Sequence, residues 1–193
     1  MGALHGDNES RNMRLNLQRH PETPGSAIDQ ITADCSLSKS GTIWLRYHAE
    51  GNVEQVKLPD VPDRSERMDN LWQQSCFELF LGQPGTEQYC EFNLSPSGNW
   101  AAYDFDRYRD GMSQLVIAKA PEIHMDFSDT HIALEATLAL PEPWVAPELD
   151  AGLSAVIETL DGEKTLWALA HPGARPDFHH RDGFTLKMEA AEG

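Results

Sequence analysis

Two glutamates on neighbouring predicted strands are the residues best placed for chemistry. Strand alternation puts Glu91 on the same face as Tyr89 and Asn93, opposite to the apolar side chains between them. If the turn Gly-Gln-Pro-Gly joins the two strands as a hairpin, Glu78 can approach Glu91 or Asn93 across it. Two nearby carboxyl groups can bind hydroxyls, or they can act as acid and base in glycoside cleavage. For a glutamate taken singly, a solvated outer sheet face is the alternative interpretation.

Aromatic rings and charges are mixed in the stretch that follows, GNWAAYDFDRYRDGM. It contains Trp100, Tyr103, Arg107, Tyr108 and Arg109. A sugar suits such a mixture, because its hydroxyls need donors and acceptors while its C–H face stacks on an aromatic ring. The alternative is a loop stabilised by cation–π contacts and surface ion pairs.

Histidines and aspartates gather near the C-terminus, in a stretch that begins at Trp167. They are His171, Asp177, His179, His180 and Asp182. Imidazole and carboxylate groups are ligands for zinc and iron. Adjacent histidines point to opposite sides of an extended segment, so at most one of His179 and His180 can join His171. We therefore expect hydrogen-bonding histidines in turns and no metal site.

Strands must position these residues, because period-two alternation recurs along the chain and helical spacing does not. Turn sequences rich in Gly and Pro separate the alternating runs. The predicted strands are 13–17, 27–36, 43–47, 53–58, 75–81, 88–94, 100–105, 114–119, 131–140, 153–160, 165–170 and 184–188. The only helix candidates are two short segments, 64–71 and 142–148. The pattern predicts an all-β fold with at most short helices, either a sandwich or a barrel.

One domain accounts for the chain of 193 residues. We expect residues 13–190 to form this β-domain. Residues 1–12 are polar and show no periodic pattern, so we expect them to be a disordered extension. The predicted core residues are Leu79, Phe92, Leu94, Val156, Ile157 and Leu166.

The charge of the chain bears on its partners. Its 31 acidic and 15 basic side chains give a net charge of −16, which argues against nucleic acid and against anionic membrane surfaces. No secretory signal and no run as long as a membrane span is recognisable. Together with three cysteines that show no CxxC spacing, this predicts a cytoplasmic protein with reduced thiols. Motifs for dinucleotides, P-loop phosphate binding, HExxH zinc sites and GxSxG nucleophiles are absent from the sequence.

Two segments, LWQQSCFELFL from Leu71 and YCEFNLSPSGNW from Tyr89, together resemble the bacterial DOMON-like proteins, which are related to the family nine carbohydrate-binding modules. Two further segments, which begin at Gly152 and Trp167, are similar to the same subgroup. The resemblance extends from about Met13 to Met188. It implies an antiparallel β-sandwich, of immunoglobulin-like or jelly-roll-like type, with a ligand site on a concave sheet face or at its rim.

The resemblance also implies two kinds of ligand. Relatives bind sugars between aromatic rings, or haem b between a Met and a His axial ligand. For a sugar, the matching positions are Trp72, Glu78, Tyr89, Glu91, Asn93, Trp100 and Arg109. For haem, the available ligands are Met112 or Met68 together with His171 or His179.

The leading hypothesis is a non-catalytic module that binds a carbohydrate or glycan fragment through aromatic and carboxylate side chains on one sheet face. A haem-binding redox module is the first alternative. A glycoside hydrolase or lyase that uses Glu78, Glu91 or Glu158 with His171 is the second. A homodimer formed through a sheet edge is a further hypothesis. The candidate ligand-binding residues are Trp72, Glu78, Tyr89, Glu91, Asn93, Trp100, Tyr103, Arg107, Arg109, Glu158, Trp167, His171 and His179.

Overall fold

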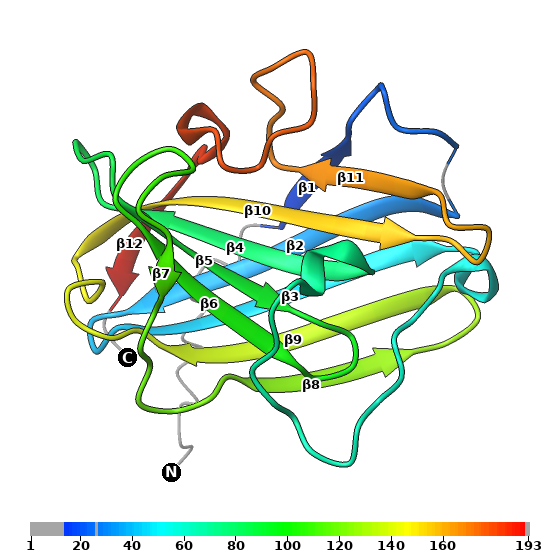
Figure 1. The fold of residues 1–193 in the computed structure, drawn as a ribbon, viewed down its shortest axis with the longest axis horizontal. Helices are drawn as coiled ribbons and strands as arrows, with labels where there is room; N and C mark the ends of the chain where they lie inside the picture. The colour runs from blue at the N-terminus through cyan, green and yellow to red at the C-terminus, as the bar shows by residue number, and fades with distance from the viewer. Residues whose placement is uncertain (1–13, 26, 192–193) are drawn as a thin grey trace, which may run out of the picture.

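The computed structural model describes residues 14–25 and 27–191, which form two layers of β-strands packed face to face (Figure 1). The prediction for residues 1–12 lies outside these described residues. One layer consists of β4 (Cys76–Gly82), β5 (Tyr89–Leu94), β6 (Trp100–Phe105), β7 (Ser113–Gln114), β10 (Glu148–Glu158) and β11 (Lys164–Ala168). The other contains β2 (Ile28–Ser38), β3 (Thr42–Gly51), β8 (Glu122–Phe127) and β9 (His131–Ala139).

Two further strands join the layers at one side. β1 (Leu15–Arg19) pairs with β2 and with β11, so the hydrogen-bonded order runs β7-β6-β5-β4-β10-β11-β1-β2-β3-β9-β8. β12 (Leu186–Ala191) pairs with β10 and, in parallel orientation, with β2. The other pairings between strands in the described part of the chain are antiparallel, which confirms the predicted all-β antiparallel sandwich. β7 and β8 end this order, and such an edge is where the predicted homodimer would form.

The hairpin of β4 and β5 has the predicted arrangement. Leu79 pairs with Phe92, and both side chains are fully buried between the two layers. Glu78 pairs with Asn93, and Glu91 is their neighbour on the same outer face. Because the side-chain period of a strand is two, a shift of one residue would exchange these faces, so burial of the apolar set also determines where the carboxyl groups point.

The predicted core residues divide between the two faces of this layer. Leu79, Phe92, Leu94 and Ile157 lie in the core between the layers, as predicted. Val156 and Leu166 pair with each other on the opposite face, outside this core, where Val156 is buried and Leu166 is half-buried. This face also carries apolar side chains, because part of it is covered by the segment that follows β11.

Three local predictions were wrong. Segment 64–71 forms no α-helix, because the backbone groups of Glu66 and Met68 bond to Trp100 at the start of β6. Segment 142–148 forms no helix: it is a turn that contains Pro143 and Pro147 and leads into β10. Segment 53–58 begins with a 3-10 turn, η1 (Val53–Gln55), instead of a strand.

Two boundaries also differ. Only Gln114 of the predicted strand 114–119 is in a strand, and β8 was not predicted. Further 3-10 turns are η2 (Leu71–Gln73) and η3 (Arg181–Gly183). None of the helical segments within the described residues has the length and apolar character needed to cross a membrane.

Candidate functional site

A groove with a volume of about 980 Å³ lies over the outer face of β4, β5 and β6. Its floor comes from these strands and from β10 and β11, and its walls come from η2, from the turn before β7 and from the segment after β11 (Figure 1). The residues that line it are Asp69, Asn70, Trp72, Glu78, Glu91, Tyr103, Phe105, Arg109, Met112, Ser113, Gln114, Val156, Lys164, Leu166, Pro176, Asp177, Phe178 and His179. Chain segments separated by more than 80 residues therefore meet at one site.

Two buried carboxyl groups, those of Glu78 and Glu91, form the polar floor. Their exposed fractions are only 3% and 5%. The Ser154 hydroxyl donates to Glu78 Oε2 at 3.2 Å, and Asn93 Nδ2 donates to Glu91 Oε1 at 2.6 Å. A carboxylate loses its hydration when it is buried, and these few hydrogen bonds do not fully replace it. Burial therefore favours the protonated form of both groups.

The pKa values of both carboxyl groups reflect this burial. Burial raises the pKa of Glu91 to about 7, although Asn93 and Arg109 act in the opposite direction. Burial also raises the pKa of Glu78 well above its usual range, and the neighbouring charge of Glu91 raises it further. At neutral pH we therefore expect Glu91 to be near its midpoint, and Glu78 to hold its proton to higher pH than an exposed glutamate does.

An imidazole faces this floor from the segment after β11. His179 Nδ1 lies 2.9 Å from the Tyr89 hydroxyl, and its Nε2 lies 3.9 Å from Glu91 Oε2. The rings of Phe80 and Phe105 pack against the imidazole, with centroid distances of 5.2 Å each. Burial and the positive charge of Arg109 lower the pKa of His179 to about 4, so the ring is neutral at physiological pH.

A cluster around Asp177 connects this segment to the turn before β7. Arg109 donates to Asp177 Oδ1 at 2.8 Å, Tyr108 donates to Oδ2 at 2.6 Å, and the His179 backbone N–H donates to Oδ1 at 3.1 Å. Burial alone would raise the pKa of Asp177, but the bonds from Tyr108 and Arg109 hold it below its usual value. The charged carboxylate thus fixes one wall of the groove to another.

The far end of the same segment is anchored by Arg181. Its guanidinium lies over Gly82 and donates to the carbonyl of Gln83 at 3.2 Å and to Asp150 Oδ2 at 3.3 Å. A Cβ at Gly82 would lie 1.4 Å from Arg181 Nη1, so glycine is required there for this guanidinium position.

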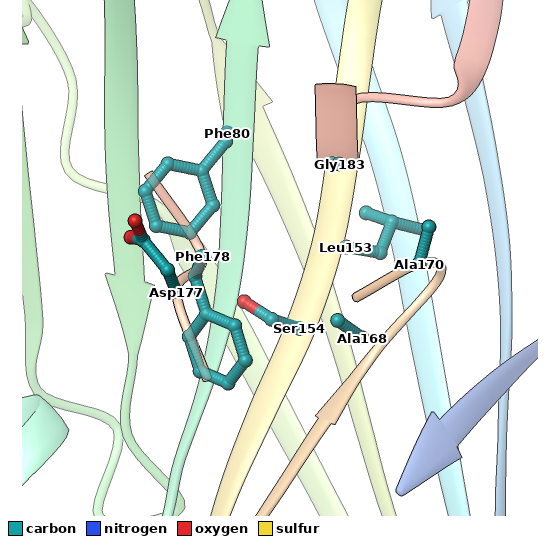
Figure 2. Close-up of a pocket in the computed structure, with 9 residues that line it drawn as sticks. Phe80, Leu153, Ser154, Ala168, Ala170, Asp177, Phe178 and Gly183 are labelled. Carbon is teal, nitrogen blue, oxygen red and sulfur yellow. The ribbon is translucent and has the colours of Figure 1, made fainter. Parts of the chain in front are cut away.

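A second, much smaller cavity lies beneath this segment. Figure 2 shows the side chains of Phe80, Ser154 and Phe178 that border it next to β10. Its volume of about 10 Å³ is at the lower limit for one water molecule, so it cannot hold an organic ligand. The large groove is the site with room for one.

An exposed tryptophan stands at the rim of the groove. Trp72 lies on η2, immediately before β4, and 51% of it is exposed. Met112, on the turn before β7, is 63% exposed, and Tyr103 donates from its hydroxyl to Asp69 at 2.6 Å. The rim is thus rich in aromatic and apolar surface above a polar floor.

Most of the predicted site residues from the two-strand region share this groove. Those that line it are Trp72, Glu78, Glu91, Tyr103, Arg109 and His179. Tyr89 and Asn93 lie on the same sheet face and hydrogen-bond His179 and Glu91. The hairpin of β4 and β5 explains why four of these residues were found from alternation alone.

Five predicted site residues lie outside the groove. Trp100 pairs with Leu94 in the ladder and Trp167 with Ala155, so both tryptophans face the core between the layers. Their large apolar surface is better buried there than on the outer face. For these two residues, the aromatic type was a misleading signal because the register across β5 and β10 decides the face.

The other three make local contacts elsewhere. Arg107 forms an exposed ion pair with Asp110, and Glu158 pairs with Lys57 at 3.1 Å. His171 lies 2.7 Å through Nε2 from the carbonyl oxygen of Gln18. Asp177, Phe178, Val156 and Leu166 line the groove but were not predicted as site residues. Of these, only Asp177 had a sequence signal, its place among the C-terminal histidines.

The residues present do not fit haem. Met68 and His171 do not line the groove, and His171 Nε2 faces a backbone carbonyl. Met112 and His179 do line it, but one nitrogen of His179 bonds Tyr89 and the other lies 3.9 Å from a carboxyl oxygen. Two buried carboxyl groups also occupy the floor, where an apolar macrocycle would need apolar contacts. Within residues 14–25 and 27–191, no group of three or more His, Cys, Asp or Glu side chains is arranged to hold a metal ion.

Comparison with solved structures identifies similar folds at low sequence identity. A proposed carbohydrate-binding protein from Bacteroides uniformis has a TM-score of 0.69 and 12% identity over 93% of this chain and 87% of that chain. The fold is a β-sandwich of the family 9 carbohydrate-binding module type. Two structures of such a module from Caldicellulosiruptor kristjanssonii support this. The complex with cellotriose has a TM-score of 0.56 and 8% identity over 94% of this chain and 84% of that chain. The complex with glucose has a TM-score of 0.52 and 8% identity over 93% and 85%. No protein-family model and no curated protein matches the sequence.

Proposed function

We propose that this protein is a non-catalytic module that binds a carbohydrate in the groove. The observation that carries the proposal is the exposed ring of Trp72 beside a floor of two buried carboxyl groups, Glu78 and Glu91, that the half-buried His179 faces. A sugar offers an apolar C–H face to a ring and hydroxyls to polar partners at the same time. Ligand sites commonly combine a mainly apolar wall with a few convergent polar groups in this way.

The similar folds support the choice of ligand. The Caldicellulosiruptor kristjanssonii module has been crystallised with glucose and with cellotriose. In the present chain the groove volume of about 980 Å³ is sufficient for an oligosaccharide fragment. Glucose and cellotriose are therefore the first probes.

The charge states on the floor also bear on the second candidate function, glycoside hydrolysis. Glycoside cleavage uses one protonated and one ionised carboxyl group, so the two environments must separate the two pKa values. Here burial raises the pKa of both Glu78 and Glu91. The nearby Asp177 carboxylate is ionised, but both of its oxygens accept hydrogen bonds from protein groups. Glycoside hydrolysis would need Glu91 as the ionised base beside a protonated Glu78, and it is tested separately.

Calorimetry with glucose and cellotriose tests the proposal. We expect heat of binding with wild-type protein, and Trp72→Ala should weaken the affinity by about 10-fold or more because the stacking ring is lost. Phe127→Ala is the matched control, because Phe127 is an aromatic residue that is 61% exposed at the end of β8, in the other layer. Equal affinities of wild type and Trp72→Ala would remove this groove from consideration.

Hydrolysis has its own test. Release of nitrophenol from a panel of nitrophenyl glycosides, lost in Glu91→Gln, would replace the binding proposal by the enzymatic one. We expect no release above that of the Glu91→Gln variant.

A further inference from the structure

A chain of hydrogen bonds behind the groove determines which nitrogen of His179 carries the proton. The backbone N–H of Arg109 donates to the Tyr89 hydroxyl oxygen at 3.1 Å. The same hydroxyl lies 2.9 Å from His179 Nδ1. Since the hydroxyl already accepts from Arg109, its own proton is available for a donor bond, and Nδ1 is the acceptor within reach.

This arrangement selects one tautomer. A neutral imidazole has one protonated and one unprotonated nitrogen. If Nδ1 accepts from Tyr89, the proton must be on Nε2, which is the nitrogen that faces Glu91. Tyr89 itself is held in place by its ring, which stacks on Phe105 with centroids 4.6 Å apart.

Glu91 presents an oxygen to this N–H without bonding it. Glu91 Oε1 accepts from Asn93, whereas Oε2 lies 3.9 Å from His179 Nε2, which is too long for a hydrogen bond. Both residues line the groove. A donor and an oxygen acceptor thus converge on the groove from two different chain segments.

We propose that His179 and Glu91 together hold one hydroxyl of the ligand, and that Tyr89 is the positioning residue that makes His179 the donor. The ligand hydroxyl accepts from His179 Nε2–H and donates to Oε2 of the ionised Glu91 carboxylate. This inference rests on the proposed carbohydrate-binding function and specifies which chemical group is recognised at this point of the groove.

The geometry agrees with a single bridging oxygen. His179 Nε2 and Glu91 Oε2 are 3.9 Å apart. A ligand oxygen that lies about 2.8 Å from each of them makes two hydrogen bonds that meet at an angle of about 90°, which a hydroxyl tolerates. A hydroxyl can accept and donate together, whereas an ammonium group only donates, and fluorine, an ether or a carboxylate only accepts. The site therefore selects an uncharged ligand with a free hydroxyl at this position.

Carboxyl groups around the groove strengthen the selection against acidic ligands. Asp69, Glu78, Glu91 and Asp177 all line it, Arg109 is already paired with Asp177, and the other basic side chain of the lining, Lys164, donates to the carbonyl of Gln73. Uronic acids would bring a further negative charge to this surface. Hydroxyl-rich neutral glycans are the class that the charges and the donor–acceptor pair both admit.

The first arm of the test uses the free protein, so it does not depend on any ligand. Nitrogen-15 NMR of the His179 ring should show a protonated Nε2 and an unprotonated Nδ1. In Tyr89→Phe the two tautomers should mix, while the ring still stacks on Phe105. Tyr103→Phe removes another hydroxyl of the groove that donates to Asp69, and it should leave the His179 tautomer unchanged. A protonated Nδ1 in the wild-type protein would overturn the proposal.

The second arm measures binding of glucose and its deoxy and fluoro derivatives at each hydroxyl position. At one position, both replacements should weaken binding by about 10-fold or more, since the fluoro derivative leaves Glu91 Oε2 without its donor and the deoxy derivative leaves both His179 and Glu91 without a partner. That penalty should shrink in Tyr89→Phe. If every fluoro derivative binds as well as glucose, no hydroxyl donates to Glu91 and the proposal is wrong. If the tautomer is as expected but neither glucose nor cellotriose binds, the proposed function fails, and the hydroxyl assignment fails with it.

Discussion

Glu91→Gln should change how the stability of the protein depends on pH. Burial raises the pKa of Glu91 from its usual 4.5 to about 7 in the folded state. Between these pH values the folded protein keeps the proton and the unfolded chain has lost it. Stability therefore falls as pH rises through this range. A rise from 4.5 to about 7 corresponds to about 3 kcal/mol of unfolding free energy.

His179 acts in the opposite direction. Its pKa is lowered from 6.5 to about 4, so between these values the unfolded chain binds a proton that the folded protein does not. Stability therefore rises with pH by about the same 3 kcal/mol. Between pH 4.5 and 6.5 the contributions of His179 and Glu91 offset each other in the wild-type protein.

Glu91→Gln removes the stability contribution that falls as pH rises and leaves the contribution of His179, which rises with pH. At each pH, the unfolding free energy of the wild type is subtracted from that of the variant. This difference should rise by about 3 kcal/mol between pH 4.5 and pH 7.5. Loss of the Glu91 charge also lowers the pKa of Glu78, which acts in the same direction. The amide oxygen of glutamine can still accept from Asn93, so the hydrogen bond on the floor is kept.

Urea unfolding at several pH values between 4.5 and 7.5, followed by tryptophan fluorescence, measures these differences. Glu87→Gln, at an exposed position between β4 and β5, is the control and should show the pH profile of the wild type. A difference between Glu91→Gln and wild type that stays constant within about 0.5 kcal/mol from pH 4.5 to 7.5 would refute the assignment of a buried, proton-holding Glu91.

Three further predictions concern the scaffold around the groove. Gly82→Ala should displace the guanidinium that lies over it and weaken sugar binding, whereas Gly25→Ala, with no heavy atom near its added Cβ, should bind as wild type in calorimetry. Leu79→Ala, in the core between the layers, should lower the unfolding free energy by about 2–5 kcal/mol in urea titrations and leave the sugar affinity nearly unchanged. Val156→Ala, on the groove face, should instead weaken sugar binding. Asp177→Asn weakens the ionic contact between two groove walls, so amides of segment 170–183 should exchange hydrogen faster.

Each of these has an outcome that contradicts it. Unchanged affinity in Gly82→Ala would show that the guanidinium position does not support the groove. A loss of less than about 1 kcal/mol in Leu79→Ala would contradict its place in the core. Exchange rates of Asp177→Asn equal to those of wild type would mean that the ion pair does not hold the segment.

Residue alternation was sufficient to predict the hairpin at the centre of the site. In β4 and β5, large apolar residues such as Leu79 and Phe92 occupy every second position, and only one face of each strand can be buried between the layers. The same rule places Glu78 and Glu91 on the outer face. The class of fold follows from the repetition of this pattern along the chain.

Alternation could not predict what covers that outer face. His179 and Asp177 reach the groove from a segment about 90 residues after β5, held by Arg109 and Arg181, and nothing local in their sequence specifies these partners. Trp100 was assigned to the site from its type, yet its register with Leu94 turns it inward.

The chemical state of the site has the same origin. A glutamate in isolation titrates near its usual pKa, and the shift of Glu91 to about 7 arises because the neighbouring strands and the covering segment exclude water from it. Periodicity within a strand is a local property of the chain, so the sequence specifies the faces of the sheet. Burial and register across strands depend on contacts between distant segments, so the tertiary structure decides which residues meet in the groove and which of them hold a proton.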